Sequence, residues 1–504
     1  MSVAVEITTP GVTALVNQST VARPIQRQPS STAFLGGYAV WGPVGVPTVI
    51  TSWLEFVRKF GGFDNNSYLA DAVYAFFQHF GGAQAIISRA VGPTPVLGTK
   101  TLLDGAGSPV ATLRVDAKYP SSVVDIKVKV ETGTAANSRK LTFSSVYLNV
   151  TEVFDNVTLA NADLTDINQK SKLVNVVNLN SATVAPNNLP AVAAAASLTS
   201  NTDDVGNITA TQYVNSLNAF TDINLGGGQV AIPGLTASSV LVALKSHAET
   251  YKRLAILDAP FGNDVSTMLG VDTTTYRSNS AALYYPWIKA NKFDGSDATK
   301  YYPPSIAALG ACAAVDRNEG VQKAPANIVV PFAIDVERNS DGTVMLNDNA
   351  RGSLAAKQIN VIAPIANEGI KIYDAQLLYP SGETRLKFVH ERRVVNLVYF
   401  SAKLGYGWAV HQTVDPQGRY FRDLRTSGKN FLRSLYNAGA LYGKTEDEAF
   451  VVTADESNNP QEELALGRVH VAMGIKISPT AQMVIINIDN VPLGQDLSVL
   501  NGGN

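Results

Sequence analysis

Apolar residues between Thr32 and Gly92 follow two periods, and together they predict a compact α/β arrangement. Residues 33–41 and 85–90 are nearly continuous apolar runs, which are typical of buried strands. Between them, Ser52 and Glu55 have the spacing of a capping box at the start of a helix. A second helix is predicted by a stripe at the i, i+3, i+4, i+7 spacing, made of Leu69, Ala72, Val73, Phe76, Phe77 and Phe80. We interpret this aromatic stripe as core packing and not as a cofactor site.

The pattern changes after Pro93 to short runs in which apolar and polar residues alternate. Residues 124–131 are the best example, because their valines and isoleucine would face one side and their charged residues the other. Residues 141–150 and 172–180 show the same alternation. We therefore expect an inserted β-rich outer domain over residues 96–235, in which the alanine tract 191–196 is a linker or a short helix.

An α/β pattern resumes at Ser238. Residues 239–251 have helical spacing, and residues 253–260 form a buried strand. Asp258 stands at the carboxyl end of that strand, where open α/β sheets bind ligands and where an aspartate more commonly caps a helix or anchors a turn. Further strands are predicted at residues 328–334 and 358–364. We assign residues 32–95 and 236–345 to one α/β core domain.

Residues 346–490 are expected to form a C-terminal domain. Their pattern predicts one long helix at about 420–442 and strands at 369–379, 392–400, 449–454, 468–477 and 483–489. Residues 491–504 are rich in turn formers and are predicted to be a C-terminal arm. On these patterns the chain is an α/β (α+β) multidomain protein without a repeat of fixed period.

The chain starts with a short strand pattern that has no nearby partner. Val3, Val5 and Ile7 alternate with Ala4 and Glu6, and the segment that follows is polar, so no hairpin is predicted. A strand of this kind needs a sheet edge elsewhere in the chain or in another copy. We therefore treat residues 1–31 as an N-terminal arm, with residues 18–31 as a flexible tether.

Composition narrows the class of protein. The chain has 504 residues, enough for three or four domains, and its net charge of −2 argues against direct binding of nucleic acid. No signal peptide or membrane-spanning run is recognisable, so we expect a protein that is made in the cytoplasm and stays soluble until it assembles, without direct membrane contact. The single cysteine, Cys312, lies between alanines and is expected to be buried.

No arrangement of residues predicts catalysis or cofactor binding. The five histidines lack metal-ligand spacing, and with one cysteine no familiar zinc site can be assembled. Neither a GxxxxGK[ST] phosphate loop nor a GxGxxG turn after a strand is present. We therefore predict no catalytic residue, no cofactor, no metal and no enzymatic activity.

One predicted helix carries a regular row of positive charges. Arg422, Arg425, Lys429 and Arg433 recur at spacings of 3, 4 and 4 residues. At about 100° per residue, these side chains lie on one stripe beside the apolar face of the helix. This basic stripe is either a solvated flank or a docking surface for an acidic partner, to which it would give orientation and register.

The block from Ala281 to Asn327 is the most informative part of the sequence. It contains an aromatic strand end (ALYYPW), a helix started by two prolines, the aspartate Asp316, and a closing turn (KAPAN). This succession resembles the most recognisable stretch of the contractile tail sheath family of bacteriophages and related injection machines. The segment from Thr32 to Gly92 resembles the same family. Two positions depart from its pattern, Ala314 and Gln322, where relatives often carry an arginine and an aromatic residue.

The resemblance implies a structural subunit of a contractile sheath. Many copies would stack as rings around an inner tail tube protein, and contraction would drive the tube through a target envelope. In that family each subunit lends terminal strands to neighbouring sheets. The corresponding residues here are Val3, Val5 and Ile7 near one end and Ile485, Ile486 and Ile488 near the other. The family's C-terminal domain faces the tube, which makes the basic stripe the candidate tube contact.

Baseplate and tail terminator proteins would be further partners, and the location would be a virion tail or an injection particle. The energy for contraction would be stored in subunit interfaces at assembly, with no nucleotide consumed. Two other classes stay open on the sequence. One is another self-assembling structural protein, such as a surface-layer or capsid component, and the other is an α/β enzyme with a β insert.

Overall fold

The computed structural model describes residues 23–337 and 346–482. The chain divides into two compact units. Of the described residues, 30–337, 346–394 and 477–482 belong to the core unit, and 23–29 and 395–476 belong to the C-terminal unit.

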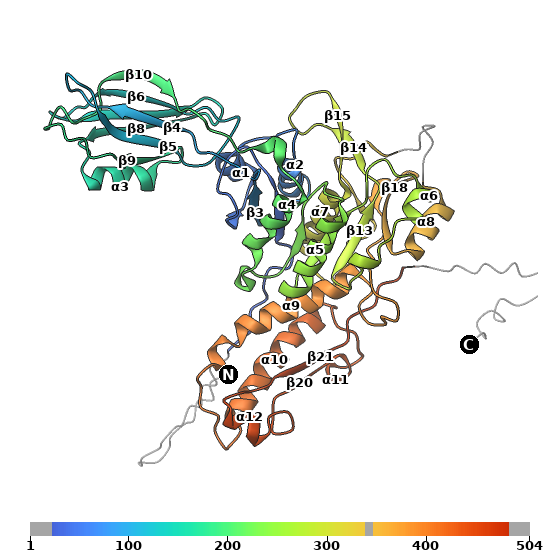
Figure 1. The fold of residues 1–504 in the computed structure, drawn as a ribbon. Coiled ribbons are helices and arrows are strands. Elements are labelled where there is room, and N and C mark those ends of the chain that lie inside the picture. The colour runs from blue at the N-terminus through green and yellow to red at the C-terminus, as the bar shows by residue number, and fades with distance from the viewer. Residues whose placement is uncertain (1–22, 338–345, 483–504) are drawn as a thin grey trace, which may run out of the picture. The chain divides into compact units, whose positions relative to one another are not determined.

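A nine-stranded sheet forms the centre of the core unit (Figure 1). Its strand order is β16-β19-β18-β13-β12-β11-β1-β3-β2. The six strands from β18 to β3 are parallel, and antiparallel strands lie at both edges. In chain order they are β1 (Ala33–Tyr38), β2 (Thr48–Ile50), β3 (Ala85–Ala90), β11 (Gln229–Ala231), β12 (Leu254–Asp258), β13 (Ala281–Tyr285), β16 (Ile328–Val329), β18 (Ile359–Ile365) and β19 (Gly369–Ile372).

Helices cover both faces of this sheet. On one face, Phe34 and Val230 belong to an apolar cluster with residues of α4, α5, α6 and α8. On the other face, Leu35 and Ala231 pack with residues of α1, α2 and α7. Successive strand residues point to opposite faces, so neighbours in sequence join different clusters. The helices are α1 (Trp53–Phe60), α2 (Leu69–Tyr74), α4 (Ala210–Ser216), α5 (Ser238–Tyr251), α6 (Val265–Leu269), α7 (Pro304–Asn318) and α8 (Asp348–Ala356).

The elements predicted for the start of the core unit are confirmed. β1 and β3 occupy the two apolar runs, and α2 continues through a π-helical turn at residues 75–79. Ser52 caps α1 by accepting a hydrogen bond from the Glu55 N–H at 3.2 Å. The Glu55 carboxylate instead accepts from the Thr51 N–H at 2.8 Å, so the cap differs from the expected reciprocal box.

Two strand groups join a different part of the molecule from the one predicted. β11 and α4 fall within residues 96–235, expected for the insert, yet β11 pairs with β1 and β12 in the central sheet. β18 and β19 come after residue 345, yet β18 pairs with β13 and β19 pairs with β18 in the same sheet. Apolar patterning identifies a strand but not the sheet it joins, because that depends on long-range packing. The core unit therefore extends to Val394.

The insert contains two antiparallel sheets and a helix. One sheet has the order β10-β6-β7-β8, the other has the order β4-β5-β9, and α3 (Asn161–Lys170) packs against β9. Val128 and Val130 of β6 are buried, as their alternation predicts. The strands are β4 (Thr99–Leu103), β5 (Ala111–Ala117), β6 (Lys127–Thr132), β7 (Arg139–Ser145), β8 (Val150–Val157), β9 (Val174–Asn178) and β10 (Ala193–Ser197).

The alanine tract at residues 191–196 is not the expected linker or short helix. It contributes most of β10, which pairs antiparallel with β6 at the edge of its sheet. Alanine favours helices in isolation, but pairing with an existing strand supplies the backbone hydrogen bonds and decides the outcome.

A smaller sheet of the core unit has the order β15-β14-β17. Its strands are β14 (Ile288–Asn291), β15 (Thr299–Tyr302) and β17 (Asp335–Val336). The strand predicted at residues 328–334 is shorter than expected, because only β16 at its start pairs. The predicted strand at 358–364 is confirmed as β18.

The C-terminal unit consists of helices and one two-stranded sheet. The predicted strand at residues 392–400 is wrong, since those residues lie in a helix, α9 (Val389–Gly405), which begins in the core unit. The predicted long helix and the strands near 449–454 and 468–477 are confirmed, each with shorter bounds. The remaining elements are α10 (Arg419–Asn437), α11 (Glu446–Ala449), β20 (Phe450–Thr453), α12 (Gln461–Ala465) and β21 (Ala472–Ile475).

Part of the predicted flexible tether is instead held by specific contacts. Ile25 is buried, and the Gln28 N–H donates to Ser401 Oγ at 3.1 Å. The prediction of a tether over residues 18–31 is therefore wrong for residues 23–30. Residues 18–22, the strand predicted at 483–489 and the arm at 491–504 lie outside the described residues.

Candidate assembly surfaces

The C-terminal unit contains a two-stranded sheet with an open outer surface. β20 and β21 pair antiparallel over four residues each. Phe450 and Val452 are buried, and Gly428 of α10 allows close approach, since a Cβ there would lie 3.0 Å from Val452 Cγ1. Val451 faces the other way and is 55% exposed. Among the described strands each of the two pairs only with the other, so each has one edge without a strand partner.

The strands predicted to be exchanged between subunits lie outside the described residues. They contain Val3, Val5, Ile7, Ile485, Ile486 and Ile488. Their exchange stays a prediction. The β20–β21 sheet has a strand edge without a strand partner, and an edge of this kind can bind an extended segment through backbone hydrogen bonds.

The four residues of the basic stripe lie on α10, and three of them have local partners. Arg422 forms an ion pair with Asp423 at 3.2 Å. Arg425 Nη1 donates to a backbone carbonyl at 2.5 Å. Arg433 Nε donates to Glu446 Oε1 at 2.7 Å, and this bond lowers the pKa of the Glu446 carboxyl.

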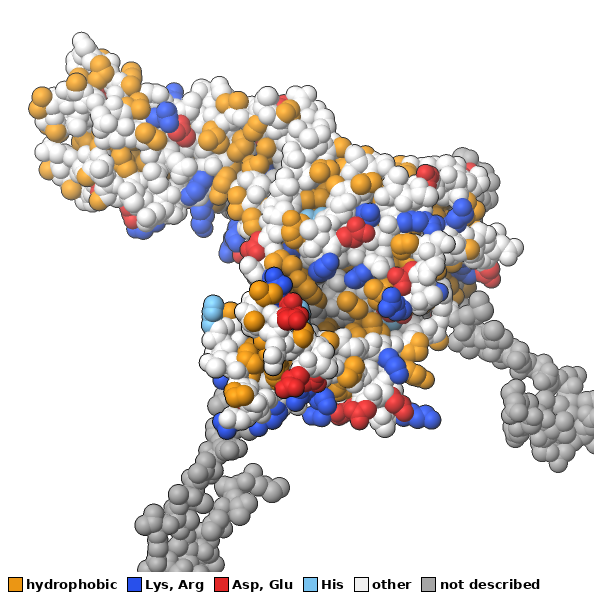
Figure 2. Space-filling view, turned by 60° about the horizontal axis from the view of Figure 1, so that its bottom comes forward, with side chains coloured by type: hydrophobic (Ala, Val, Ile, Leu, Met, Phe, Trp, Pro, Cys, Tyr) orange, Lys and Arg blue, Asp and Glu red, His pale blue; other side chains and the backbone are white. Residues whose placement is uncertain are grey.

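Lys429 differs from the other members of the stripe. Within residues 23–337 and 346–482 it makes no hydrogen bond or ion pair, and it influences Glu446 only through its charge. The space-filling view shows Lys and Arg side chains interspersed with Asp and Glu side chains, without a uniform basic field (Figure 2). The ion pairs of the stripe with Asp423, Asp455 and Glu446 balance most of its positive charge.

The aromatic strand end and most of α7 in the block that carries the family resemblance are buried in the core unit, whereas residues 294–299 of the block are exposed. Tyr284 and Tyr285 at the end of β13 are completely buried. The indole N–H of Trp287 donates to a backbone carbonyl at 2.8 Å. In α7, Gly310 faces the ring of Phe80, and a Cβ at that glycine would lie 2.0 Å from a ring carbon. These residues pack the core of the unit.

Asp258 anchors the start of α7. Its carboxylate accepts hydrogen bonds from the N–H and hydroxyl of Ser305, at 2.6 and 2.7 Å, and from the Gly234 N–H at 2.9 Å. Burial raises the pKa of the Asp258 carboxyl to about 6, and the three hydrogen bonds oppose that rise. The structure supports a helix-capping role for this residue over a ligand site.

Asp316 holds two chain segments that lead out of the core unit. Its carboxylate lies 2.6 Å from Arg393 Nη2 and accepts a hydrogen bond from the Ser30 hydroxyl at 2.5 Å. Arg393 is buried and also donates to the Cys312 carbonyl at 3.2 Å. Residues 29 and 395, next to these partners, are where the chain passes to the C-terminal unit. Asp316 therefore fixes, within the core unit, the two chain segments that lead to the C-terminal unit.

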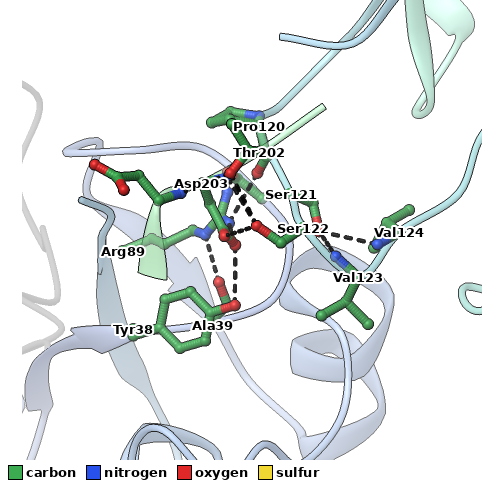
Figure 3. Close-up of polar contacts among 12 residues, drawn as sticks. Tyr38, Ala39, Arg89, Pro120, Ser121, Ser122, Val123, Val124, Thr202 and Asp203 are labelled. Carbon is green, nitrogen blue, oxygen red and sulfur yellow. Dashed lines mark hydrogen bonds and ion pairs between the residues drawn. The ribbon is translucent and has the colours of Figure 1, made fainter. Parts of the chain in front are cut away.

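A buried arginine stands where the insert joins the central sheet (Figure 3). Arg89 of β3 is completely buried and donates to the carbonyls of Ala39, Gly42 and Pro120 at 2.6, 3.0 and 2.9 Å. Its Nη2 also lies 3.2 Å from Asp203 Oδ2. One side chain of the sheet is thus bonded to the loop between β5 and β6 of the insert, at Pro120, and to the returning chain connection, at Asp203.

Asp203 completes this neck, which we define as Tyr38, Arg89, Pro120, Ser122 and Asp203. The Tyr38 hydroxyl donates to Asp203 Oδ2 at 2.9 Å, and the Ser122 hydroxyl donates to Oδ1 at 2.7 Å (Figure 3). Burial raises the pKa of the Tyr38 hydroxyl, so it stays a donor. Charge-assisted bonds away from water hold the insert in place.

The neck was not predicted from the sequence, although one signal for it exists. Arg89 is the only charged residue in the apolar run at 85–90, and a buried charge requires a partner. That partner follows 114 residues later, a separation that no local pattern reveals.

Metal-binding side chains are not grouped in the described part of the chain. No three His, Cys, Asp or Glu side chains there are placed to hold a metal ion. Cys312 is buried, and burial raises the pKa of its thiol to about 11, so it is not activated as a nucleophile. None of the described helices is both long and apolar enough to cross a membrane.

Comparison with known proteins defines the class of fold. No protein-family model matches the chain, and no curated protein matches it. Solved structures of sheath proteins match most of its length. The chain therefore has the fold of contractile sheath proteins, and the predicted resemblance is confirmed at the level of the fold.

Three solved structures illustrate this similarity. The PVC sheath complex of an extracellular contractile injection system, in its contracted state, is 17% identical with a TM-score of 0.59, and the match covers 98% of this chain and 100% of that chain. The anti-feeding prophage baseplate is 16% identical with a TM-score of 0.55, covering 96% and 100%. The sheath tail protein from Listeria innocua is 13% identical with a TM-score of 0.60, covering 84% and 88%.

Proposed function

We propose that this chain is a structural subunit of a contractile sheath. Many copies stack as rings around an inner tail tube protein, and the sheath contracts to drive the tube through a target envelope. The proposal is supported by a fold shared, over 98% of the chain, with a sheath complex in its contracted state. Baseplate and tail terminator proteins are the proposed further partners. The proposed location is a virion tail or injection particle assembled in the bacterial cytoplasm.

The observation that carries the assembly proposal is the open edge of the β20–β21 sheet. Two strands alone form a marginally stable sheet, and a strand added at the edge extends its backbone hydrogen bonding. We propose that neighbouring copies supply this strand from the terminal segments that contain Val3, Val5 and Ile7 or Ile485, Ile486 and Ile488. A strand bound in this way keeps subunits connected while each rotates as a rigid body.

The basic stripe on α10 is proposed to contact the tube. Lys429 is available for an acidic partner, whereas Arg422, Arg425 and Arg433 would exchange present partners for new ones. Such contacts contribute register and orientation more than affinity, because surface ion pairs stabilise by only about 1 kcal/mol or less.

Deletion of residues 1–20 tests strand exchange. We expect a folded subunit with unchanged cooperative unfolding that no longer polymerises. Circular dichroism would follow folding, and sedimentation with negative-stain imaging would follow assembly. Sheaths of normal length from the deletion variant would refute the exchange.

A single substitution makes the same test in the full chain. Val5→Pro removes a backbone N–H and is incompatible with a central strand, whereas Val5→Thr keeps strand propensity. We expect the proline variant to lose assembly and the threonine variant to retain it. Images of wild-type tubes that shorten and widen would separate a sheath from any other self-assembling structural protein.

A further inference from the structure

Residues 23–28, which we call the anchor segment, are attached to the surface of the C-terminal unit. The guanidinium carbon of Arg23 lies 4.2 Å from the centre of the Trp408 ring. Ile25 is buried, with 7% of its surface exposed. The Gln28 N–H donates to Ser401 Oγ of α9 at 3.1 Å. A cation over an aromatic face, a buried apolar side chain and a backbone hydrogen bond together fix this stretch.

Gly405, the last residue of α9, makes the docking possible. A Cβ at this glycine would lie 2.6 Å from both Cγ atoms of Ile25 and 2.8 Å from its Cβ. Distances this short are not tolerated, so any larger residue displaces Ile25. Gly407, two residues later, has no heavy atom within 4 Å of the equivalent position.

The chain is held again directly after the anchor segment. The Ser30 hydroxyl donates to Asp316 Oδ2 at 2.5 Å in the core unit. Only Pro29 separates Gln28, bonded in the C-terminal unit, from Ser30, bonded in the core unit. Contacts at residues 23, 25, 28 and 30 therefore hold this stretch at intervals, so it adds no free length to an arm.

We propose that the anchor segment is the fixed base of the N-terminal arm. A force that a neighbouring copy exerts on the exchanged strand is then transmitted to α9 at Gly405. This inference rests on the proposed strand exchange and adds where the exchanged strand is attached to its own subunit. The arm that reaches the neighbour then comprises only residues 1–22.

The fixed base limits the distance over which strands can be exchanged. Arg23 comes 16 residues after Ile7. A fully extended chain spans at most about 3.3–3.6 Å per residue, so the exchanged strand ends within about 55 Å of Arg23. The receiving β20–β21 sheet of the neighbour has to lie inside that radius in both the extended and the contracted sheath.

Limited digestion of the unassembled protein with trypsin tests the docking itself. The Arg27–Gln28 bond is the relevant site, because trypsin does not cleave before the proline that follows Arg23. We expect Gly405→Ala and Ile25→Asp to raise cleavage at Arg27 at least ~10-fold, since cleavage follows the population of the released segment. The matched control, Gly407→Ala, is expected to be cleaved as slowly as the wild type. Unchanged cleavage in both test variants would overturn the proposal.

Assembly and contraction of the same variants test whether the force from a neighbouring copy is transmitted to α9 through the anchor segment. Ile25→Asp subunits are expected to fold and to form sheaths, because their terminal strand is intact. When contraction is triggered with mild denaturant, we expect separated rings in most Ile25→Asp particles and continuous sheaths in the wild type. Leu404→Asp, an exposed position beside Gly405, is the control and should contract intact.

The two experiments separate the two proposals. Intact contraction of Ile25→Asp sheaths, with the segment released in the digestion, would overturn the attachment point while leaving strand exchange standing. Absence of any sheath from the wild-type protein would remove the proposed function and this mechanism with it, while the digestion would still report the docking.

Discussion

Three arginines are among the largest fully buried side chains, and each joins separate segments of the chain. Arg89 bonds the insert, and Arg393 bonds α7 to α9. Arg253 donates to three carbonyls in residues 220–226 and lies over the ring of Phe34 at 3.8 Å. The guanidinium group suits this role because it offers five donors in a planar fork.

Replacing Arg89 by methionine is predicted to destabilise the core unit strongly. In Arg89→Met the buried Asp203 carboxylate loses its cation, which typically costs about 3–5 kcal/mol. The matched control is Arg114→Met, because the Arg114 side chain is 45% exposed beside Asp116 and its loss is expected to cost under about 1 kcal/mol. Denaturant unfolding monitored by tryptophan fluorescence measures both.

A second substitution distinguishes the ion pair from simple loss of packing. Arg89→Met combined with Asp203→Leu removes both charges, and part of the lost stability should return. A double variant less stable than Arg89→Met, or equal losses at Arg89 and Arg114, would contradict the assignment of the neck.

Residue roles that depend on near neighbours could be predicted from the sequence. The cap at Ser52 and the burial of Cys312 follow from local spacing. The Asp316 contacts could not be predicted, because Ser30 is 286 residues away in sequence. Partners of this kind are set by the packing of the sheet and its helices, which only the complete fold determines.

At the scale of elements, α9 shows how strand propensity can mislead. Residues 392–400 contain valines and aromatic residues that favour strands locally. Over a longer window, the buried positions 389, 393, 397 and 400 recur at helical spacing. The Glu391 carboxylate also accepts the N–H groups of residues 387 and 388 and so caps the helix start. The helical spacing of the buried positions and this cap together outweigh the local preference for a strand.

The contact between α7 and the π-helical turn provides a test of helix packing. Gly310→Ala would place a Cβ 2.0 Å from the Phe80 ring, so we expect a loss of about 1–3 kcal/mol from overpacking. Gly352→Ala in α8 meets no heavy atom within 4 Å and is expected to stabilise by up to about 1 kcal/mol through helix propensity. Urea unfolding of the two variants should therefore show shifts of opposite sign, and shifts of the same sign would argue against this packing.

At the scale of the whole molecule, the class of fold could be predicted from the sequence. The division of the chain into structural units could not. The α/β core, the β-rich insert and the sheath resemblance all followed from patterns in the sequence. The assignment of β11, β18 and β19 to the central sheet did not, because each pairs with strands distant in sequence. Long-range pairing has no signature in a single strand.

The proposed tube contact predicts an effect of charge at one position of the basic stripe. Lys429→Glu reverses the charge without breaking a bond within the described residues, and like charges across an interface repel strongly. We expect tube-dependent sheath assembly to fall at least ~10-fold, which corresponds to about 1.4 kcal/mol. Lys357→Glu, an exposed position on the core unit, is the control with the same charge change. Wild-type yield of sheath from Lys429→Glu would remove the stripe from the tube interface.

The neck also bears on how such a chain can change over evolutionary time. Beside it, the two connections of the insert are bonded directly to each other, from Gly92 to Asp203 at 2.8 Å and from Val96 to Thr202 at 2.8 Å. The two ends of the insert are therefore adjacent in space. A recombination event that exchanged the coding segment for residues 97–201 would leave the order of the central strands intact. Natural variants are therefore expected to differ in this lobe more than anywhere else, and a foreign module could be grafted there with little cost to folding.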